Sequence, residues 1–115
     1  MKMAFGAGLG VAVSLVATPV RAEMTVSGAT YQCERGVEIV ATYVNDAEAA
    51  VAVINVEGRQ IALKITRSAS GARYAWPSDG SGYVWWTRGD DATLLWSDGT
   101  GGEEVTLLAA CHARM

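Results

Sequence analysis

Short runs of alternating hydrophobic and polar residues fill most of this chain, and turn-forming residues separate them. The clearest run is Arg59 to Arg67, in which Ile61, Leu63 and Ile65 would face one side of a strand and the residues between them the other. A period of two residues is typical of a half-buried strand. Comparable runs, rich in β-branched and aromatic residues, recur after residue 28, so the pattern predicts an all-β domain.

Eight short strands are predicted, each followed by residues that favour turns. The turn segments include Asn45-Asp46, Glu57-Gly58 and the glycine-rich stretches 78–82 and 97–102. Turn signals spaced about 8–12 residues apart are typical of an antiparallel barrel or sandwich. No long segment has helical periodicity. The predicted strands are Ala29–Cys33, Val37–Val44, Ala50–Val56, Arg59–Arg67, Ala72–Trp76, Tyr83–Thr87, Ala92–Trp96 and Glu103–Cys111.

The first 22 residues are predicted to be a cleaved signal peptide. Lys2 supplies a positive charge, Met3–Val16 is apolar, and Val20-Arg21-Ala22 has the pattern that precedes a signal-peptidase cut. A membrane anchor is the alternative, but the apolar run is shorter than the roughly 20 residues that a spanning helix needs. No cysteine stands at the predicted cut, so we expect no lipid anchor, and the short apolar run disfavours a membrane span. The mature chain would be exported as one domain, residues 23–115.

The mature domain is predicted to be acidic. The whole chain carries 9 basic and 12 acidic residues, and its formal charge is −3. Cleavage removes Lys2 and Arg21 and no acidic residue, which takes the charge to −5. Nucleic-acid binding requires clustered Lys and Arg to neutralise phosphates, so that function is disfavoured. An acidic surface would instead attract a basic partner.

Two cysteines, Cys33 and Cys111, lie near the two ends of the predicted domain. An even count in an exported chain favours a disulfide. A metal site is the alternative, although His112 is the one nearby imidazole and the spacing matches no familiar ligand set. A disulfide would join the first and last strands, which suits a closed barrel because closure brings terminal strands together.

Candidate catalytic groups are few. A nucleophile usually needs a histidine as base, and the single histidine, His112, is expected to be a solvated residue near a fraying end. The carboxylate pairs Asp90-Asp91 and Glu103-Glu104 are adjacent, so on a strand their side chains would point to opposite faces and could not converge. There is no phosphate-binding glycine loop and no metal-ligand cluster. The sequence therefore predicts a protein without enzymatic activity, cofactor or metal.

Four tryptophans, Trp76, Trp85, Trp86 and Trp96, stand in this small domain. We expect two or three of them to fill the barrel interior. Trp85 and Trp86 are adjacent, so one should face inward and the other outward. The outward ring is a candidate contact residue, because tryptophan often anchors interfaces. An exposed tryptophan would equally suit a carbohydrate- or small-ligand-binding barrel, so that function stays open as an alternative.

Two linked motifs point to one known family. Ser70-Gly71-Ala72-Arg73-Tyr74 is followed by Tyr83-Val84-Trp85-Trp86-Thr87-Arg88-Gly89. These segments resemble the Ser-Gly-x-x-Tyr and Tyr-x-x-x-Thr-Lys-Gly motifs of the membrane-bound and periplasmic inhibitors of C-type lysozyme, the MliC/PliC family. The resemblance covers essentially the whole mature chain, from Tyr31-x-Cys33 to Cys111.

The resemblance implies a small antiparallel β-barrel in the periplasm that inhibits C-type lysozyme and so helps the cell to evade host defence. By position, Ser70 and Arg88 would enter the lysozyme cleft and block its catalytic carboxylates. Arg88 stands where the family usually has lysine, and a forked guanidinium is not equivalent to an ammonium group. The resemblance further implies that the glycines keep the loop turns tight and that the other motif residues support the loops: Gly71, Gly89, Tyr74, Tyr83 and Thr87. A structural envelope protein without a soluble ligand is a third possibility.

Overall fold

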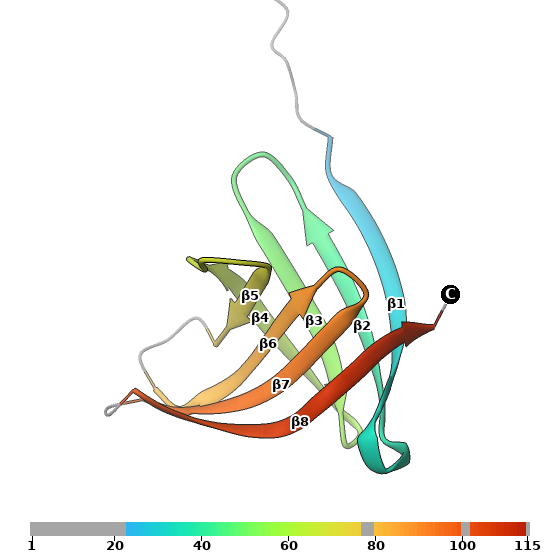
Figure 1. The fold of residues 1–115 in the computed structure, drawn as a ribbon. Coiled ribbons are helices and arrows are strands. Elements are labelled where there is room, and N and C mark those ends of the chain that lie inside the picture. The colour runs from blue at the N-terminus through green and yellow to red at the C-terminus, as the bar shows by residue number, and fades with distance from the viewer. Residues whose placement is uncertain (1–22, 77–79, 100–101, 115) are drawn as a thin grey trace, which may run out of the picture.

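The chain forms a closed antiparallel β-barrel (Figure 1). A computed structural model describes residues 23–76, 80–99 and 102–114. Within them each strand pairs with its neighbour in sequence, and the last strand pairs with the first. The elements are β1 (Thr25–Cys33), a 3-10 turn η1 (Glu34–Gly36), β2 (Glu38–Asn45), β3 (Ala50–Val56), β4 (Arg59–Thr66), β5 (Ala72–Ala75), β6 (Gly82–Arg88), β7 (Asp91–Asp98) and β8 (Glu103–Arg114).

Two hairpin turns show why these strands end where they do. Between β3 and β4, Glu57 and Gly58 both have positive φ, 53° and 79°. Positive φ at both central residues is the requirement of the tight I′ turn, whose twist matches that of the strands it joins. Between β6 and β7, Gly89 has φ 59° and Asp90 follows it. Glycine at the first central position is the requirement of the related II′ turn.

The barrel closes where the two cysteines meet. β1 and β8 pair from Thr30↔Arg114 to Cys33↔Cys111, and the two cysteines form a disulfide. The expected disulfide and the expected closed barrel of eight strands are confirmed. The alternative of a cysteine metal site is excluded, because both sulfur atoms are bonded to each other.

The barrel interior is built from the inward-facing residues of every strand. Trp85 and Ile54 are fully buried at its centre, and smaller residues such as Ala41 and Ala52 leave room for the large rings. Three polar groups of aromatic side chains satisfy one another: Trp85 Nε1 donates to Tyr43 Oη at 2.8 Å, and the Tyr31 and Tyr43 hydroxyls lie 2.7 Å apart. Burial, reinforced by the hydrogen bond to Tyr31, raises the pKa of Tyr43 well above its ordinary value.

The predicted strands are all present, with differences at their ends. β1 begins four residues earlier than expected, at Thr25, because it pairs with β2 as far as Thr25↔Asn45. β8 runs three residues further, to Arg114, because barrel closure gives its end a partner in β1. His112 is exposed as expected, yet it is part of a strand that is paired on both sides and does not lie in a frayed end.

The expectation for the tryptophans is wrong in number. Only Trp85 fills the interior, whereas Trp76 and Trp96 are 44% and 37% exposed and Trp86 is half-buried on the outer surface. Trp76 follows the end of β5, and Trp96 lies near the end of β7 opposite Tyr83, so both are at the ends of their strands rather than beside Trp85. The inward–outward split of Trp85 and Trp86 is confirmed.

The predicted signal peptide, residues 1–22, lies outside the described residues, as do parts of the two glycine-rich loops at 77–79 and 100–101. In the described part of the chain, no helix has the length and apolar character needed to cross a bilayer.

Candidate functional site

Ser70 lies in the exposed loop between β4 and β5. Its carbonyl oxygen accepts two hydrogen bonds, from Ser68 Oγ at 2.6 Å and from Trp86 Nε1 at 2.9 Å. These bonds hold the backbone of the loop and leave the Ser70 side chain free. Among the described residues no hydrogen-bond partner of the Ser70 hydroxyl occurs, so this hydroxyl is available to a ligand.

Gly71 brings the loop of the first motif against the end of the second, beyond the pairing of β5 with β6. Its φ is 69°, and a Cβ atom added there would collide with the Thr87 carbonyl oxygen and lie 2.7 Å from Arg88 Cγ. Only glycine combines this backbone conformation with so close an approach. The Ser70 loop therefore packs directly against the end of β6, and the two motifs form one site.

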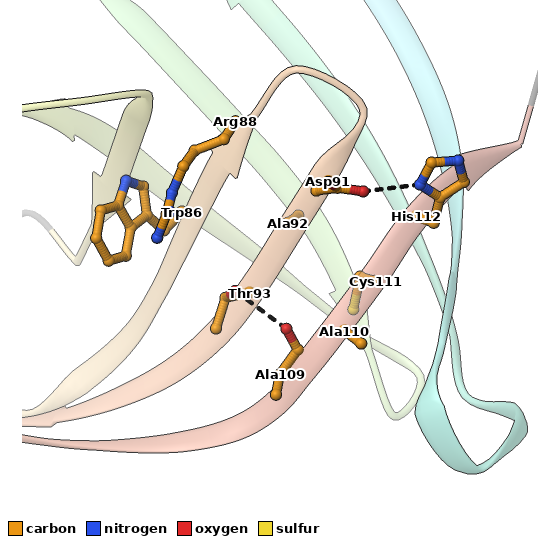
Figure 2. A pocket seen from close by; sticks show the side chains of 9 residues that line it. All are labelled: Trp86, Arg88, Asp91, Ala92, Thr93, Ala109, Ala110, Cys111 and His112. Carbon is orange, nitrogen blue, oxygen red and sulfur yellow. Dashed lines mark hydrogen bonds and ion pairs between the residues drawn. The ribbon is translucent and has the colours of Figure 1, made fainter.

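Arg88 is the last residue of β6 and is exposed. Its guanidinium carbon lies 4.1 Å from the centre of the Trp86 ring, a cation–π contact. Figure 2 shows the Arg88 side chain extending toward Trp86 rather than toward Asp91 and His112. No ion pair involves Arg88 among the described residues, so its donor groups are available to a carboxylate from outside.

The other motif residues lie in three different surroundings. Thr87 Oγ1 donates to the Ala72 carbonyl at 3.4 Å, which links β6 to β5 beside the site. Tyr74 is buried, with its ring 5.7 Å from that of Tyr43, and burial raises its pKa. Tyr83 packs edge-on against Trp96 near the opposite end of β6 from Arg88. Tyr83 is therefore too far along β6 to contact the Ser70 loop or the Arg88 hairpin directly.

A hollow of about 500 Å³ lies beside Arg88 (Figure 2). Trp86 and Arg88 border one side of it. Asp91 and His112 border the other, with Asp91 Oδ1 2.7 Å from His112 Nδ1. The remaining lining comes from the backbones and small side chains of β7 and β8: Ala92, Thr93, Ala109, Ala110 and Cys111.

The described residues around the hollow do not form a metal centre. Asp91 and His112 are both largely exposed, with 75% and 70% of their side-chain surface accessible. Within residues 23–76, 80–99 and 102–114 no group of three or more histidine, cysteine, aspartate or glutamate side chains converges on a point. The arrangement around Ser70 and Arg88 can donate and accept hydrogen bonds and can attract a carboxylate.

Sequence reasoning proposed Ser70, Gly71 and Arg88 as site residues but missed the contacts that Trp86 makes between them. The signal was present, because Trp86 and Arg88 are two residues apart on one strand and so lie on the same face. The contribution of Arg73 was also missed. It pairs with Trp86 across β5 and β6, and its guanidinium carbon lies 5.5 Å from the Trp86 ring centre.

Comparison with protein families and curated proteins gives consistent matches. The sequence model of the family described as MliC, membrane-bound lysozyme-inhibitor of c-type lysozyme, matches residues 31–102. A membrane-bound lysozyme inhibitor of C-type lysozyme from Pseudomonas aeruginosa is 35% identical over 103 residues, which cover 89% of this chain and 76% of the relative. A protein of the same name from Cupriavidus necator is 41% identical over 64 residues, or 56% of this chain, and the match spans about half (48%) of that relative's length.

Two solved structures share the barrel. Pseudomonas aeruginosa MliC, crystallised in complex with hen egg white lysozyme, has a TM-score of 0.63 and 29% identity, with 91% of this chain and 99% of that chain covered. PliC-St, the periplasmic lysozyme inhibitor of C-type lysozyme from Salmonella typhimurium, has a TM-score of 0.63 and 22% identity, with 77% and 98% covered, and supports the fold. On the family match and the Pseudomonas aeruginosa relative together, the chain belongs to the MliC family of lysozyme inhibitors of C-type lysozyme.

Proposed function

We propose that this protein inhibits C-type lysozyme by inserting the Ser70 loop and the Arg88 hairpin into the active-site cleft of the enzyme. The observation that carries the proposal is the contact at Gly71, which joins an unpaired serine hydroxyl and an unpaired guanidinium into one exposed site. Membership of the family and the likeness to an inhibitor crystallised with hen lysozyme support the choice of target.

The chemistry of the two groups matches that of the proposed target. Lysozyme cleaves its substrate with one protonated and one ionised carboxyl group. The Ser70 hydroxyl can donate or accept a hydrogen bond, so it can bind either form of a carboxyl group. The Arg88 guanidinium can hold a carboxylate through two parallel hydrogen bonds. Occupation of the cleft would exclude both the sugar chain and the attacking water.

The charge of the domain favours the same partner. C-type lysozymes are basic as a class, whereas the predicted mature domain carries −5. Opposite net charges steer two proteins toward each other and raise the association rate. We expect one-to-one binding and an interface of about 1,600 Å² in total, the size common to protein inhibitors of enzymes.

A periplasmic location completes the proposal. It rests on the predicted signal peptide and on the names of the relatives, one of which is described as periplasmic. In the periplasm such an inhibitor would protect peptidoglycan from lysozyme that crosses the outer membrane.

The carbohydrate-binding alternative is less favoured at the two tryptophans for which it was suggested, Trp85 and Trp86. Trp85 is fully buried, and the Arg88 guanidinium lies over the ring of Trp86. A sugar stacking on Trp86 would have to displace that guanidinium. Titration with peptidoglycan fragments, followed by tryptophan fluorescence, would revive the alternative if it produced a clear shift that lysozyme did not.

A turbidity assay tests the proposal directly. Purified residues 23–115 are mixed with hen lysozyme, and lysis of a cell-wall suspension is followed with and without the protein. We expect dose-dependent protection that saturates near one inhibitor per enzyme. No protection from a folded, disulfide-bonded sample would refute the proposed function.

Replacement of Arg88 tests the site. We expect Arg88→Ala to weaken binding by about 2–5 kcal/mol, because a buried carboxylate of the enzyme would lose its partner. This corresponds to a rise in Kd of roughly 30-fold to several thousand-fold. The matched control is Arg59→Ala, since Arg59 is an exposed arginine at the β3–β4 hairpin, at the other end of the barrel (Figure 1). Equal inhibition by both variants and wild type would remove Arg88 from the mechanism.

A further inference from the structure

Trp86 makes contact with both halves of the proposed binding site. Its indole Nε1 donates a hydrogen bond of 2.9 Å to the Ser70 carbonyl, and its ring lies 4.1 Å from the Arg88 guanidinium carbon. Trp86 is therefore one side chain whose edge holds the serine loop while its ring holds the arginine. Among residues 23–76, 80–99 and 102–114, no other side chain both bonds the Ser70 carbonyl and contacts the Arg88 guanidinium.

The contact with the ring restricts a side chain that would otherwise be free. An exposed arginine samples many rotamers, and each binding event must select the one that reaches the partner. A guanidinium held against an aromatic ring through its flat face keeps its N–H groups directed outward from its edge. The Arg88 guanidinium is thus held in place before binding, with its carboxylate-binding donors still available.

A second arginine reinforces the arrangement from β5. Arg73 pairs directly with Trp86 in the sheet, and its guanidinium carbon lies 5.5 Å from the ring centre. Arg73 in turn forms an ion pair with Glu104 of β8, in which 21% and 30% of the two side chains are exposed. Because Arg73 is held in an ion pair with Glu104, its guanidinium stays beside the Trp86 ring. Arg88, which has no such ion pair among the described residues, is then the arginine of the two that can bind a carboxylate of the partner.

We propose that Trp86 is a positioning residue for lysozyme binding, which holds the Ser70 loop and the Arg88 guanidinium together in the geometry that the cleft accepts. This inference rests on the proposed function and deepens it. It also gives a reason for arginine at a position where the family motif has lysine. The planar guanidinium stacks on the ring through its whole face, whereas an ammonium group meets a ring as a point charge.

Two substitutions separate the two contacts of Trp86. Trp86→Phe keeps an aromatic ring beneath Arg88 but removes the N–H donor, whereas Trp86→Leu removes both. If Arg88 then occupied the bound geometry about one tenth of the time, loss of the ring contact alone would raise Kd about tenfold, and Trp86→Leu, which also loses the hydrogen bond, would raise it about thirtyfold. Loss of the single hydrogen bond in Trp86→Phe should raise Kd only about threefold.

The matched controls are Trp96→Phe and Trp96→Leu. Trp96 is a partly exposed tryptophan near the end of β7, and its ring packs against Tyr83 away from the site. We expect both controls to keep Kd within about twofold of wild type, as for independent sites. Thermal unfolding of all four variants checks the fold, which should survive because Trp86 is not among the buried core residues.

Repeating the Phe and Leu substitutions in an Arg88→Ala background distinguishes positioning from direct contact. If Trp86 acts through Arg88, the two double variants should have Kd values within about twofold of each other, because no guanidinium is left to stack. If Trp86 binds lysozyme itself, the difference between Phe and Leu would persist without Arg88. That outcome would overturn the inference.

NMR of the free protein supplies a readout that does not depend on lysozyme. The Arg88 side-chain protons should show upfield ring-current shifts in wild type and in Trp86→Phe, and lose them in Trp86→Leu. Unshifted Arg88 protons in wild type would overturn the positioning inference and leave the proposed function standing. A wild-type protein that shows the shifts but does not bind lysozyme would instead overturn the proposed function, and the inference with it.

Discussion

Replacement of Gly71 by alanine should lower the unfolding free energy and weaken lysozyme binding. The same replacement at Gly58 separates the cost of the backbone conformation from the cost of the collision. Gly71 has φ 69°, and Gly58, in the β3–β4 turn, has φ 79°. Alanine at either position must adopt a left-handed conformation, which costs about 1–2 kcal/mol. An added Cβ at Gly58 meets nothing within 4 Å, so Gly58→Ala isolates that backbone cost.

The surroundings of Gly71 add a second cost. A Cβ there collides with the Thr87 carbonyl oxygen and lies 2.7 Å from Arg88 Cγ and 3.2 Å from Trp86 Nε1. Relieving such a collision typically costs a further 1–3 kcal/mol or so. We therefore expect Gly71→Ala to lose about 2–5 kcal/mol of unfolding free energy, against about 1–2 kcal/mol for Gly58→Ala.

Thermal unfolding measures the stability difference, and titration with hen lysozyme measures binding. For a domain of this size, each kcal/mol corresponds to a change of about 4–8 °C in Tm, so the two variants should be well resolved. Gly71→Ala should also weaken lysozyme binding, because the collision forces the Ser70 loop away from Arg88. Gly58→Ala should bind like wild type. Equal stability losses in the two variants, with binding unchanged in both, would refute the account of Gly71 as the contact between the motifs.

Two further predictions concern the barrel. Burial raises the pKa of Tyr43 above its ordinary value of 10.0, so the contribution of the neutral Tyr43 hydroxyl to the unfolding free energy is complete below about pH 10 and is lost as pH rises further. Tyr43→Phe should therefore flatten the alkaline fall in unfolding free energy, and an unchanged fall would contradict this prediction. The same substitution should cost about 1–3 kcal/mol at neutral pH, because Trp85 Nε1 loses its acceptor. Replacing Cys33 and Cys111 together by serine opens a loop of 78 residues and should cost about 4–5 kcal/mol in urea unfolding; a loss below about 1 kcal/mol would argue against the loop-entropy account.

The strands could be predicted because their signals are local. Alternation in β4 and the Glu57-Gly58 turn depend on neighbouring residues alone, and a tight hairpin then fixes which strands pair. The strand ends could not be predicted as well. β1 and β8 are longer than expected because their extra residues are held by partners distant in sequence.

The exposure of the four tryptophans could be predicted only in part from alternation along the strands. Alternation correctly separated Trp85 from Trp86, because adjacent residues on a strand face opposite sides. It could not give the level of a residue along the barrel axis. Trp96 alternates with the buried Leu94 and yet is 37% exposed, because it lies near the end of β7, while Trp76 lies beyond the end of β5.

By itself the sequence determined the all-β class, the order of the strands, the cysteine pair and the two motifs that carry Ser70 and Arg88, since each of these depends on residue type and short-range spacing. Only the tertiary structure decided that the motifs meet at Gly71 and that Trp86 links them. The physical reason is that barrel closure and strand register bring residues from separate loops within contact distance. Those distances follow from the pairing of whole strands, which no short segment of sequence contains.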